Sequence, residues 1–199
     1  MRILSFVDMH GSVNAFKKIK EKAENSDIII CAGDFSVWGK AQESILRQFN
    51  SLKKPFIIIP GNHESDAELK SFCREFKNLS YAHKRLLKVD DFLIIGYGGG
   101  GFSQREEGFE DFVEDVKEEL KNKKIILVTH GPPYGTEVDK INSDYKGCKS
   151  FKKFIDKYNP LIHICGHLHE TWGKKQLYNN TLILNPGPVG RIVVLKPKE

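Results

Sequence analysis

The sequence predicts an α/β fold in which mainly parallel strands are covered on both faces, with helices outside. A unit of apolar strand, loop and amphipathic helix occurs three times in the first part of the chain. Its strands, such as Phe56–Ile59, are continuous apolar runs without polar alternation. Strands of this kind have both faces buried, as in parallel sheets with helices outside.

The first unit pairs a strand at Ile3–Val7 with a helix whose apolar residues recur at helical spacing from Val13 to Ala23. Ser12 and Asn14 are both suitable N-cap residues for this helix. The other two units repeat the order of strand and helix, and we expect their elements at Ile28–Ala32, Ala41–Leu52, Phe56–Ile59 and Asp66–Phe76.

The second part of the chain begins with a strand at Asp91–Tyr97 and an amphipathic helix whose apolar stripe runs from Phe109 to Leu120. A buried strand, a Pro/Gly-rich loop, a helix and another buried strand follow. From Glu170 onward the strands are short and are separated by Asn-Asn and Pro-Gly-Pro turns, which predicts antiparallel hairpins. These elements are expected at Ile125–Thr129, Cys148–Tyr158, Leu161–Cys165, Lys175–Tyr178, Thr181–Leu184 and Ile192–Leu195.

Length and composition favour a single domain over residues 1–199. Of the 199 residues, 40% are hydrophobic and 29% are charged, a composition typical of folded proteins and unlike that of disordered or fibrous chains. No apolar run approaches the roughly 20 residues that span a bilayer. The apolar stretch before Asp8 is too short for a secretory signal. We therefore expect a cytoplasmic protein with no membrane partner.

Charge and cysteine spacing narrow the function classes further. The 31 Lys and Arg residues exceed the 26 Asp and Glu residues by five, which helps anionic substrates approach but falls short of a nucleic-acid-binding composition. The cysteines lie far apart in the sequence and form no C-x-x-C pair. We therefore expect reduced, buried thiols and no disulfide or zinc site at Cys31, Cys73, Cys148 and Cys165.

Polar residues suited to metal binding follow the predicted strands, at the point where each strand ends. In an α/β sheet the carboxyl ends of the strands border the ligand crevice, so these loops should converge in space. Glycines stand beside most of these clusters, which suits tight turns close to a ligand. The clusters are Asp8-Met9-His10, Gly33-Asp34, Gly61-Asn62-His63-Glu64, Thr129-His130-Gly131 and Gly166-His167-Leu168-His169.

These clusters combine imidazole nitrogens with carboxylate and amide oxygens and contain no thiolate. Such donors suit Mn, Fe, Co, Ni or Zn better than an all-oxygen calcium or magnesium site. Alternate residues of an extended segment point the same way, so Asp8 and His10 can hold one ion, and His167 and His169 have the same spacing. Two ions at ~3.5–4 Å need an anionic bridge, and Asp34 is the candidate.

The five motifs, in this order, resemble those of the calcineurin-like metallophosphoesterase superfamily, and most closely those of its small stand-alone phosphoesterases. The match runs from Asp8 to His169. The resemblance implies a four-layer α/β/β/α sandwich of two packed mixed β-sheets flanked by helices. It also implies two divalent metal ions, most simply manganese, and hydrolysis of a small phosphomonoester or phosphodiester by in-line attack of a metal-bridging hydroxide.

Carried over position by position, the resemblance gives each motif residue a role. Asp34 would bridge both metals. His63 would be the catalytic histidine, which protonates the leaving-group oxygen or hydrogen-bonds to it, and Glu64 is a candidate for orienting His63. The first metal would be held by Asp8, His10, His169 and Asp34, and the second by Asp34, Asn62, His130 and His167.

The chain departs from the serine/threonine phosphatase branch at three positions. Val37 and Trp38 stand where that branch has an Asp-Arg pair, and Pro60 stands where it has an arginine before Gly-Asn-His-Glu. The arginines that clamp a phosphate are therefore missing, which counts against a phosphoprotein substrate. Two alternatives remain open: a nuclease that uses the basic net charge, and a non-catalytic protein-binding scaffold on the same fold.

Other conspicuous residues lie outside the five motifs. Gly98–Gly101 could form an anion-binding nest, but it lacks the ending of a P-loop, so we favour a mobile loop at the rim of the site. In the loop after His130, Tyr134 is a candidate for either substrate stacking or packing, and His83 and His163 are expected to be structural or surface residues and not catalytic ones. The candidate substrate contacts after the glycines are Phe102, Ser103 and Arg105.

Overall fold

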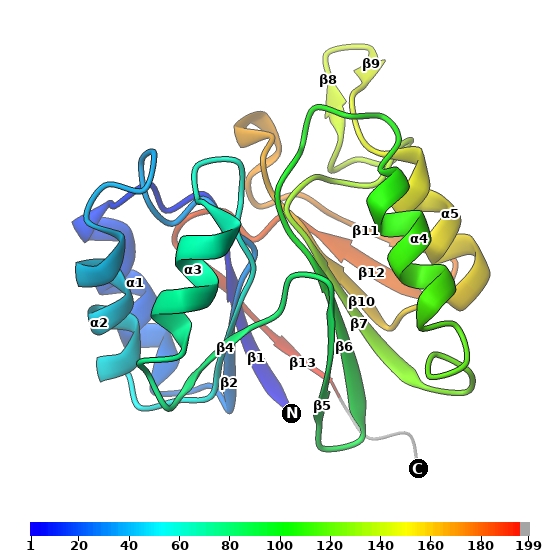
Figure 1. Ribbon diagram of the computed structural model, residues 1–199. Coiled ribbons are helices and arrows are strands. Elements are labelled where there is room, and N and C mark those ends of the chain that lie inside the picture. Colours follow the sequence, from blue (N-terminus) through cyan, green and yellow to red (C-terminus); the bar gives the residue numbers. More distant parts are fainter. Residues whose placement is uncertain (196–199) are drawn as a thin grey trace.

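In a computed structural model that describes residues 1–195, the strands form two large sheets and one small hairpin (Figure 1). The expected domain extends to residue 199, and residues 196–199 lie outside the described part. The first sheet consists, in spatial order, of β13 (Arg191–Val194), β1 (Arg2–Phe6), β2 (Ile28–Cys31), β3 (Phe56–Ile58) and β4 (Leu79–Tyr81). In this sheet β1 to β4 are parallel, and β13 is antiparallel to β1.

The second sheet has parallel strands at its centre and an antiparallel strand at each edge. In spatial order it consists of β11 (Lys175–Tyr178), β12 (Thr181–Leu184), β10 (Ile162–Ile164), β7 (Lys124–Thr129), β6 (Phe92–Tyr97) and β5 (Arg85–Val89). The small hairpin pairs β8 (Lys140–Ile141) with β9 (Asp144–Tyr145) and stands apart from both sheets.

The helices cover the outer faces of the two sheets (Figure 1). The first sheet is covered by α1 (Val13–Ala23), α2 (Gln42–Ser51) and α3 (Asp66–Cys73), and the second by α4 (Glu107–Asp115) and α5 (Lys149–Tyr158). The layers are therefore helix, sheet, sheet and helix, which confirms the predicted α/β/β/α sandwich.

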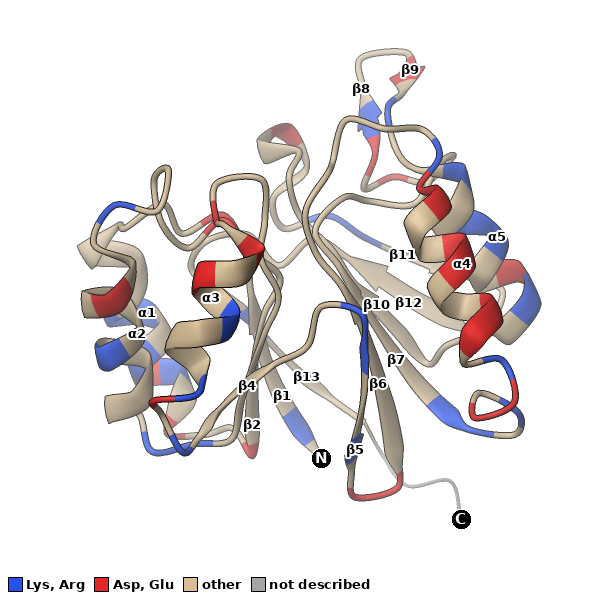
Figure 2. Ribbon diagram, in the orientation of Figure 1, with Lys and Arg blue, Asp and Glu red and all other residues tan. Residues whose placement is uncertain are grey.

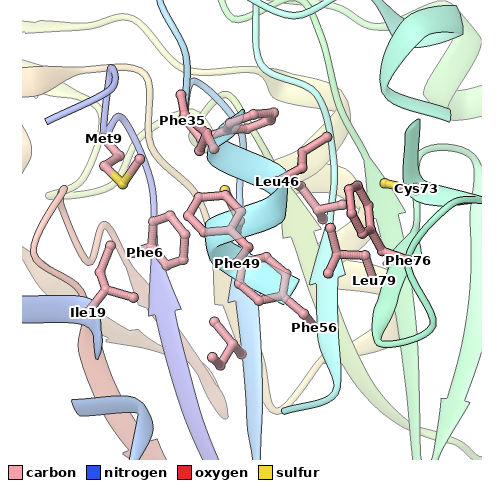
Figure 3. Packing of buried hydrophobic residues seen from close by; sticks show 14 of the residues in the cluster. Phe6, Met9, Ile19, Phe35, Leu46, Phe49, Phe56, Cys73, Phe76 and Leu79 are labelled. Carbon is pink, nitrogen blue, oxygen red and sulfur yellow. The ribbon is translucent and has the colours of Figure 1, made fainter. Parts of the chain in front are cut away.

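The alternating directions of side chains along β1 explain its unbroken apolar run. Leu4 and Phe6 pack into the cluster under the first three helices, whereas Ile3 and Val7 pack between the two sheets. Several aromatic rings pack together in the first of these clusters (Figure 3), where Phe49 of α2 stacks on Phe56 of β3 with ring centroids 4.8 Å apart. A third cluster lies between the second sheet and its helices.

The end of the chain differs from the expected series of antiparallel hairpins. β11 and β12 form a hairpin as predicted, but β13 leaves that sheet and pairs with β1 of the other one. Proline cannot continue a strand ladder, and Pro186 and Pro188 separate β12 from β13. After this break Ile192 packs under the helices and Val193 packs between the sheets, so β13 closes the edge of the first sheet.

The predicted apolar stripe from Phe109 to Leu120 is only partly helical. The helix α4 ends at Asp115, and turns continue the chain to Leu120, which is nevertheless buried. The last turn of α4 carries Glu114 and Asp115 and no basic residue. Negative charge at a helix C-terminus interacts unfavourably with the helix dipole.

The short strand β4 and the partly exposed edge strand β5 were not predicted.

Charged residues lie on exposed helix faces. Acidic residues are frequent along α4 and basic residues along the neighbouring α5 (Figure 2), so the two charge runs lie on adjacent helices. Of the two candidate N-cap residues of α1, Ser12 is the N-cap, because its side chain accepts a hydrogen bond from the Ala15 amide at 3.2 Å.

All four cysteines are buried and free. Within residues 1–195, no helix has the length and apolarity to cross a membrane.

Candidate metal centre

The loops that follow β1, β2, β3, β7 and β10 bring the candidate ligands together. The first three strands belong to one sheet and the last two to the other, so the site spans the junction between the sheets. Several of these residues have left-handed backbone conformations, which are costly outside glycine and are common at functional sites. The φ angle is 53° at Asp8, 47° at His10, 50° at Asp34 and 70° at His167.

One group of candidate ligands consists of Asp8, His10 and His169, whose ligand atoms all lie within 4.8 Å of one another. The Nε2 atoms of the two histidines are 3.2 Å apart. Asp8 is 1% exposed, and its Oδ2 accepts hydrogen bonds from the indole N–H of Trp172 at 3.0 Å and from the amide of His167 at 3.1 Å. These two hydrogen bonds hold the Asp8 carboxylate in place beside the two histidines.

The second group consists of Asp34, His130 and His167, again with ligand atoms within 4.8 Å. Asn62 points its Oδ1 into this group and lies 3.0 Å from both His130 Nε2 and His167 Nδ1. His130 Nε2 is 3.4 Å from Asp34 Oδ2. All four residues that the resemblance assigns to the second metal therefore have a possible ligand atom in this group.

Asp34 lies between the two groups, because its carboxylate also reaches His10 and His63 within 4.8 Å. It is 2% exposed, and burial by itself raises the pKa of such a carboxyl. Hydrogen bonding and the charge of His130, together with the His63 amide at 2.9 Å, outweigh burial and lower the pKa of Asp34 to about 2. The bridging candidate is thus an anion at neutral pH.

Backbone carbonyls select the ring nitrogens that face the site. His130 Nδ1 lies 2.9 Å from the Ala32 carbonyl oxygen, and His10 Nδ1 lies 3.3 Å from that of Ser36. A carbonyl oxygen only accepts, so in the neutral rings each Nδ1 carries the proton and donates it. Each Nε2 therefore presents a lone pair to the other candidate ligands, the arrangement usual for metal-binding histidines.

His63 adjoins both groups and contacts the loop after β2. Its Nδ1 accepts a hydrogen bond from the Trp38 amide at 3.3 Å, and its Nε2 is 3.9 Å from Asp34 Oδ2. The indole of Trp38 stacks on the imidazole with centroids 4.2 Å apart and planes at 23°. Because Nδ1 accepts, the neutral ring carries its proton on Nε2, which faces the site.

Among the described residues the Glu64 carboxylate forms no hydrogen bond with the His63 ring, so the expected direct role of Glu64 in orienting that ring is wrong. Its buried carboxylate accepts hydrogen bonds from the amides of Asp34, Ser36 and Gly61 and from the Ser36 hydroxyl. The loops after β2 and β3 thus direct four hydrogen-bond donors to the Glu64 carboxylate, which pairs polar groups that these loops bury. Glu64 thereby locks together the two loops that carry Asp34 and Asn62.

The glycine-rich segment lies at the rim of the site. The amides of Gly98 and Gly99 donate to His83 Nδ1 and to the Pro60 carbonyl, so they are not free to cradle a phosphate. A Cβ at Gly101 would lie 2.8 Å from three atoms of the His167 ring, so glycine is required for this close approach. The next residue, Phe102, lines the pocket.

The pocket above the candidate ligands has a volume of about 330 Å³. Its remaining walls come from Phe102, Ile141 of β8, Leu168 and Glu170, and none of its lining residues within the described chain is a lysine or arginine. Of the other expected substrate contacts, Arg105 is instead paired with Glu107 and Glu110, and Ser103 contacts Arg105. The ring of Tyr134 packs near Tyr145.

Some contacts of the site were not predicted from the sequence. These are the indole of Trp172, the amide and ring of Trp38, the wall residue Ile141 and the carbonyl groups that orient the histidines. The position of Trp172 three residues after His169 is a weak signal that could have pointed to it. The carbonyl contacts leave no signature in residue type.

Comparison with known proteins identifies the class. The sequence pattern of the calcineurin-like phosphoesterase family matches residues 1–171, so the chain belongs to this family. It is therefore a phosphoric ester hydrolase of a family that uses divalent metals, and the two side-chain groups described above are its candidate metal ligands.

Matches to individual proteins extend over nearly the whole chain. An uncharacterized protein of Methanocaldococcus jannaschii is 28% identical over 94% of this chain and 88% of its own length. A probable glycerophosphodiester phosphodiesterase of Arcobacter nitrofigilis is 25% identical over 95% of this chain and 73% of its own length. A solved structure from Thermus thermophilus superimposes with a TM-score of 0.75 at 18% identity, over 94% of this chain and 88% of the other, and shows the same fold.

Proposed function

We propose that this protein hydrolyses a small phosphodiester at a dinuclear centre of two divalent cations. The observation that carries the proposal is the position of Asp34, a buried carboxylate within reach of both groups of candidate ligands. In the proposed centre Asp34 bridges the two cations. Asp8, His10 and His169 complete the first site, and Asn62, His130 and His167 complete the second.

The donor set fits such cations. Imidazole nitrogens and carboxylate oxygens are mixed in each group, which favours manganese or a neighbouring transition metal over calcium or magnesium. The carbonyl-bound Nδ1 atoms of His10 and His130 support metal binding through Nε2. When bound, two cations would activate a water molecule for attack on phosphorus and offset charge on the phosphoryl oxygens.

The chain supplies a hydrogen-bond donor for the leaving group. In the proposed reaction the Nε2–H of His63 donates a hydrogen bond to the leaving-group oxygen as the bond from phosphorus to that oxygen breaks, and the proton that this oxygen finally carries comes from the attacking water. The amide of Trp38, which donates to Nδ1, keeps the proton on the other nitrogen. Water supplies the new oxygen on phosphorus, and the products are a phosphomonoester and an alcohol.

A diester substrate is favoured over a monoester by the charge of the pocket. A monoester carries up to two negative charges and is usually held by arginine or lysine, whereas no lysine or arginine is among the pocket-lining residues of the described chain. Glu170 at the rim adds a negative charge. The name of the Arcobacter relative, a phosphodiesterase, supports the same choice.

The two alternative functions have less support. A non-catalytic scaffold has no need to retain a complete ligand set and a histidine at position 63, and this chain has all of them. For a nuclease, the net charge of +5 is the only favourable feature, and it is not concentrated at the pocket.

The proposal is tested by turnover of bis-p-nitrophenyl phosphate. We expect hydrolysis with added Mn²⁺, loss of activity with a chelator, and recovery when Mn²⁺ is restored. Asp34→Asn should lower kcat on the order of 100-fold or more, since loss of groups that merely support ligands costs 10- to 100-fold. Asp156→Asn, an exposed carboxylate change on α5, is the control. Full activity in excess chelator would contradict the proposal.

A further inference from the structure

Exposed aromatic side chains gather around the pocket. Among residues 1–195 they are Trp38, Phe102, Tyr145 and Trp172, with exposed fractions of 69%, 81%, 37% and 41%. Three of them lie against histidines of the site, and Tyr145 belongs to β9, the partner of the strand that carries Ile141. Large apolar groups left in water around one polar pocket mark a surface that a ligand covers.

Trp38 extends the wall formed by His63. One face of its indole rests on the imidazole, yet most of the side chain is exposed. The backbone at Trp38 is left-handed, with φ of 51°, an unfavourable conformation for a bulky residue. The fold thus holds a largely exposed indole directly against His63.

Phe102 stands beside His167, another histidine within 4.8 Å of Asp34. Its ring stands edge-on to His167, with centroids 4.4 Å apart and planes at 85°, and it lines the pocket directly. It reaches this position because Gly101 fits against the His167 ring without a Cβ. Trp38 and Phe102 therefore stand beside two different histidines, His63 and His167, and each of these lies within 4.8 Å of Asp34.

We propose that Trp38 and Phe102 select phosphodiesters whose ester arms are planar aromatic groups. This inference rests on the proposed function. Trp38 stacks on the arm whose oxygen accepts the hydrogen bond from His63 and then leaves, and Phe102 contacts the arm that stays on phosphorus. Aromatic pairs gain binding energy from ring geometry beyond the apolar area they bury. Aryl groups and nucleobases share this chemistry, and both are candidates for the arms.

The first test uses inhibitors that cannot be hydrolysed. Diphenylphosphinate and dimethylphosphinate have the same charge and differ only in their arms, so the ratio of their inhibition constants reports the arms alone. With the Mn²⁺-loaded enzyme we expect diphenylphosphinate to bind at least about tenfold more tightly. Trp38→Ala and Phe102→Ala should each reduce this ratio roughly three- to tenfold, and calorimetric titration should give the same order.

Matched variants separate stacking from other effects. Trp38→Phe keeps a flat ring and should retain most of the preference, whereas Trp38→Leu keeps apolar bulk without a ring and should lose it. Leu177→Ala removes an exposed apolar side chain from β11 and should leave the ratio unchanged. An equal ratio in wild type and both alanine variants would overturn the inference.

A second test distinguishes the two sources of a planar arm. Phenyl, methyl and thymidine 5′ esters of p-nitrophenyl phosphate share one leaving group, so their kcat/KM values compare only the retained arm. A preference for the phenyl or the thymidine ester over the methyl ester, lost in Phe102→Ala, supports the inference and identifies the arm. Turnover of all three at equal kcat/KM would overturn the inference alone, whereas no turnover of any phosphoester would overturn the proposed function as well.

Discussion

The candidate ligand side chains are held by neighbouring groups that are not ligands themselves. The carbonyls of Ala32 and Ser36 orient two imidazoles, the carboxylate of Glu64 ties two ligand loops together, and the indole N–H of Trp172 fixes Asp8. Groups of this kind set the direction of a ligand's lone pairs. Their loss should therefore weaken metal binding more than it weakens folding.

Trp172→Phe tests this expectation at one residue. The variant keeps a ring against His169 but removes the donor to Asp8, so we expect the affinity for Mn²⁺ to fall about 10- to 100-fold. Metal titration followed by calorimetry measures it. Trp38→Phe is the matched control, because the Trp38 ring has no contact with a ligand carboxylate among the described residues, and its affinity should stay near wild type. Equal Mn²⁺ affinities for the wild type, Trp172→Phe and Trp38→Phe would contradict the role of Trp172.

At the scale of elements, the β8–β9 hairpin depends on one buried carboxylate. Asp139 is fully buried and accepts hydrogen bonds from the amides of Gly135, Thr136 and Gly147 and from the Thr136 hydroxyl. These donors lie on both sides of the hairpin, which carries Ile141 over the pocket. The carboxylate thus links the stability of the loop to the shape of the substrate pocket.

Asp139→Asn should loosen this hairpin. An amide cannot accept every one of these hydrogen bonds, and a buried donor left unpaired costs about 1–3 kcal/mol. We expect a loss of that size in urea unfolding and a rise in KM larger than any fall in kcat. Asp144→Asn, at the exposed end of the same hairpin, should change both quantities little. A wild-type KM in a destabilised Asp139→Asn variant would show that the hairpin does not shape the pocket.

The central strand β10 carries a histidine that resists protonation. His163 is fully buried, its Nε2 lies 2.7 Å from the Thr129 hydroxyl, and its Nδ1 has no hydrogen-bond partner within residues 1–195. Burial lowers its pKa to about 3. As the pH falls below 6.5 the unfolded chain binds a proton that the folded ring does not, so the free energy of unfolding decreases until the pH approaches 3.

His163→Leu should remove this part of the acid sensitivity. Between pH 8 and pH 5 the wild type should lose about 2 kcal/mol of unfolding free energy through His163, in addition to losses that the two proteins share. Urea unfolding of both proteins at the two pH values gives the difference. An identical pH dependence in both would show that His163 is protonated in the folded state.

At the scale of the whole molecule, the candidate ligands join the two sheets. Asp8, Asp34 and Asn62 follow strands of the first sheet, and His130 and His167 follow strands of the second. Cations held between them would tie both halves of the sandwich together in the folded state only. Metal binding should therefore raise the stability of the entire fold and not of one loop.

Removal of metal should lower the melting temperature. A ligand at 100 times its dissociation constant stabilises the folded state by about 2.7 kcal/mol, which corresponds to a shift of roughly 5–10 °C for a chain of this size. Calorimetric scans with Mn²⁺ and with chelator measure the shift, and it should be much smaller in Asp34→Asn. An equal shift in that variant would place the bound metal elsewhere.

Most strands and helices and the positions of the metal-binding clusters could be predicted because they depend on local patterns, whereas the four-layer arrangement of two sheets was implied only by the family resemblance. Apolar runs such as Ile28–Ala32 predict buried strands, and polar residues at strand ends predict a site at the carboxyl edge. These features need only the periodicity of a strand and the geometry of parallel sheets.

Features that depend on contacts distant in the sequence could not be predicted. The pairing of β13 with β1 joins the two ends of the described chain, and the bond from Trp172 to Asp8 spans 164 positions. The change of partner for Glu64, from the expected His63 to backbone amides, also depends on how two loops meet. No residue pattern reports such contacts, because they follow from the packing of the completed sandwich.

The central claim is that Asp34 is shared by two cations, and an anomalous difference map from Mn²⁺-loaded crystals tests it most directly. We predict two peaks in each chain about 3.5–4 Å apart, one beside Asp8, His10 and His169 and the other beside Asn62, His130 and His167, with the Asp34 carboxylate between them. A single peak, or peaks out of reach of Asp34, would contradict the claim.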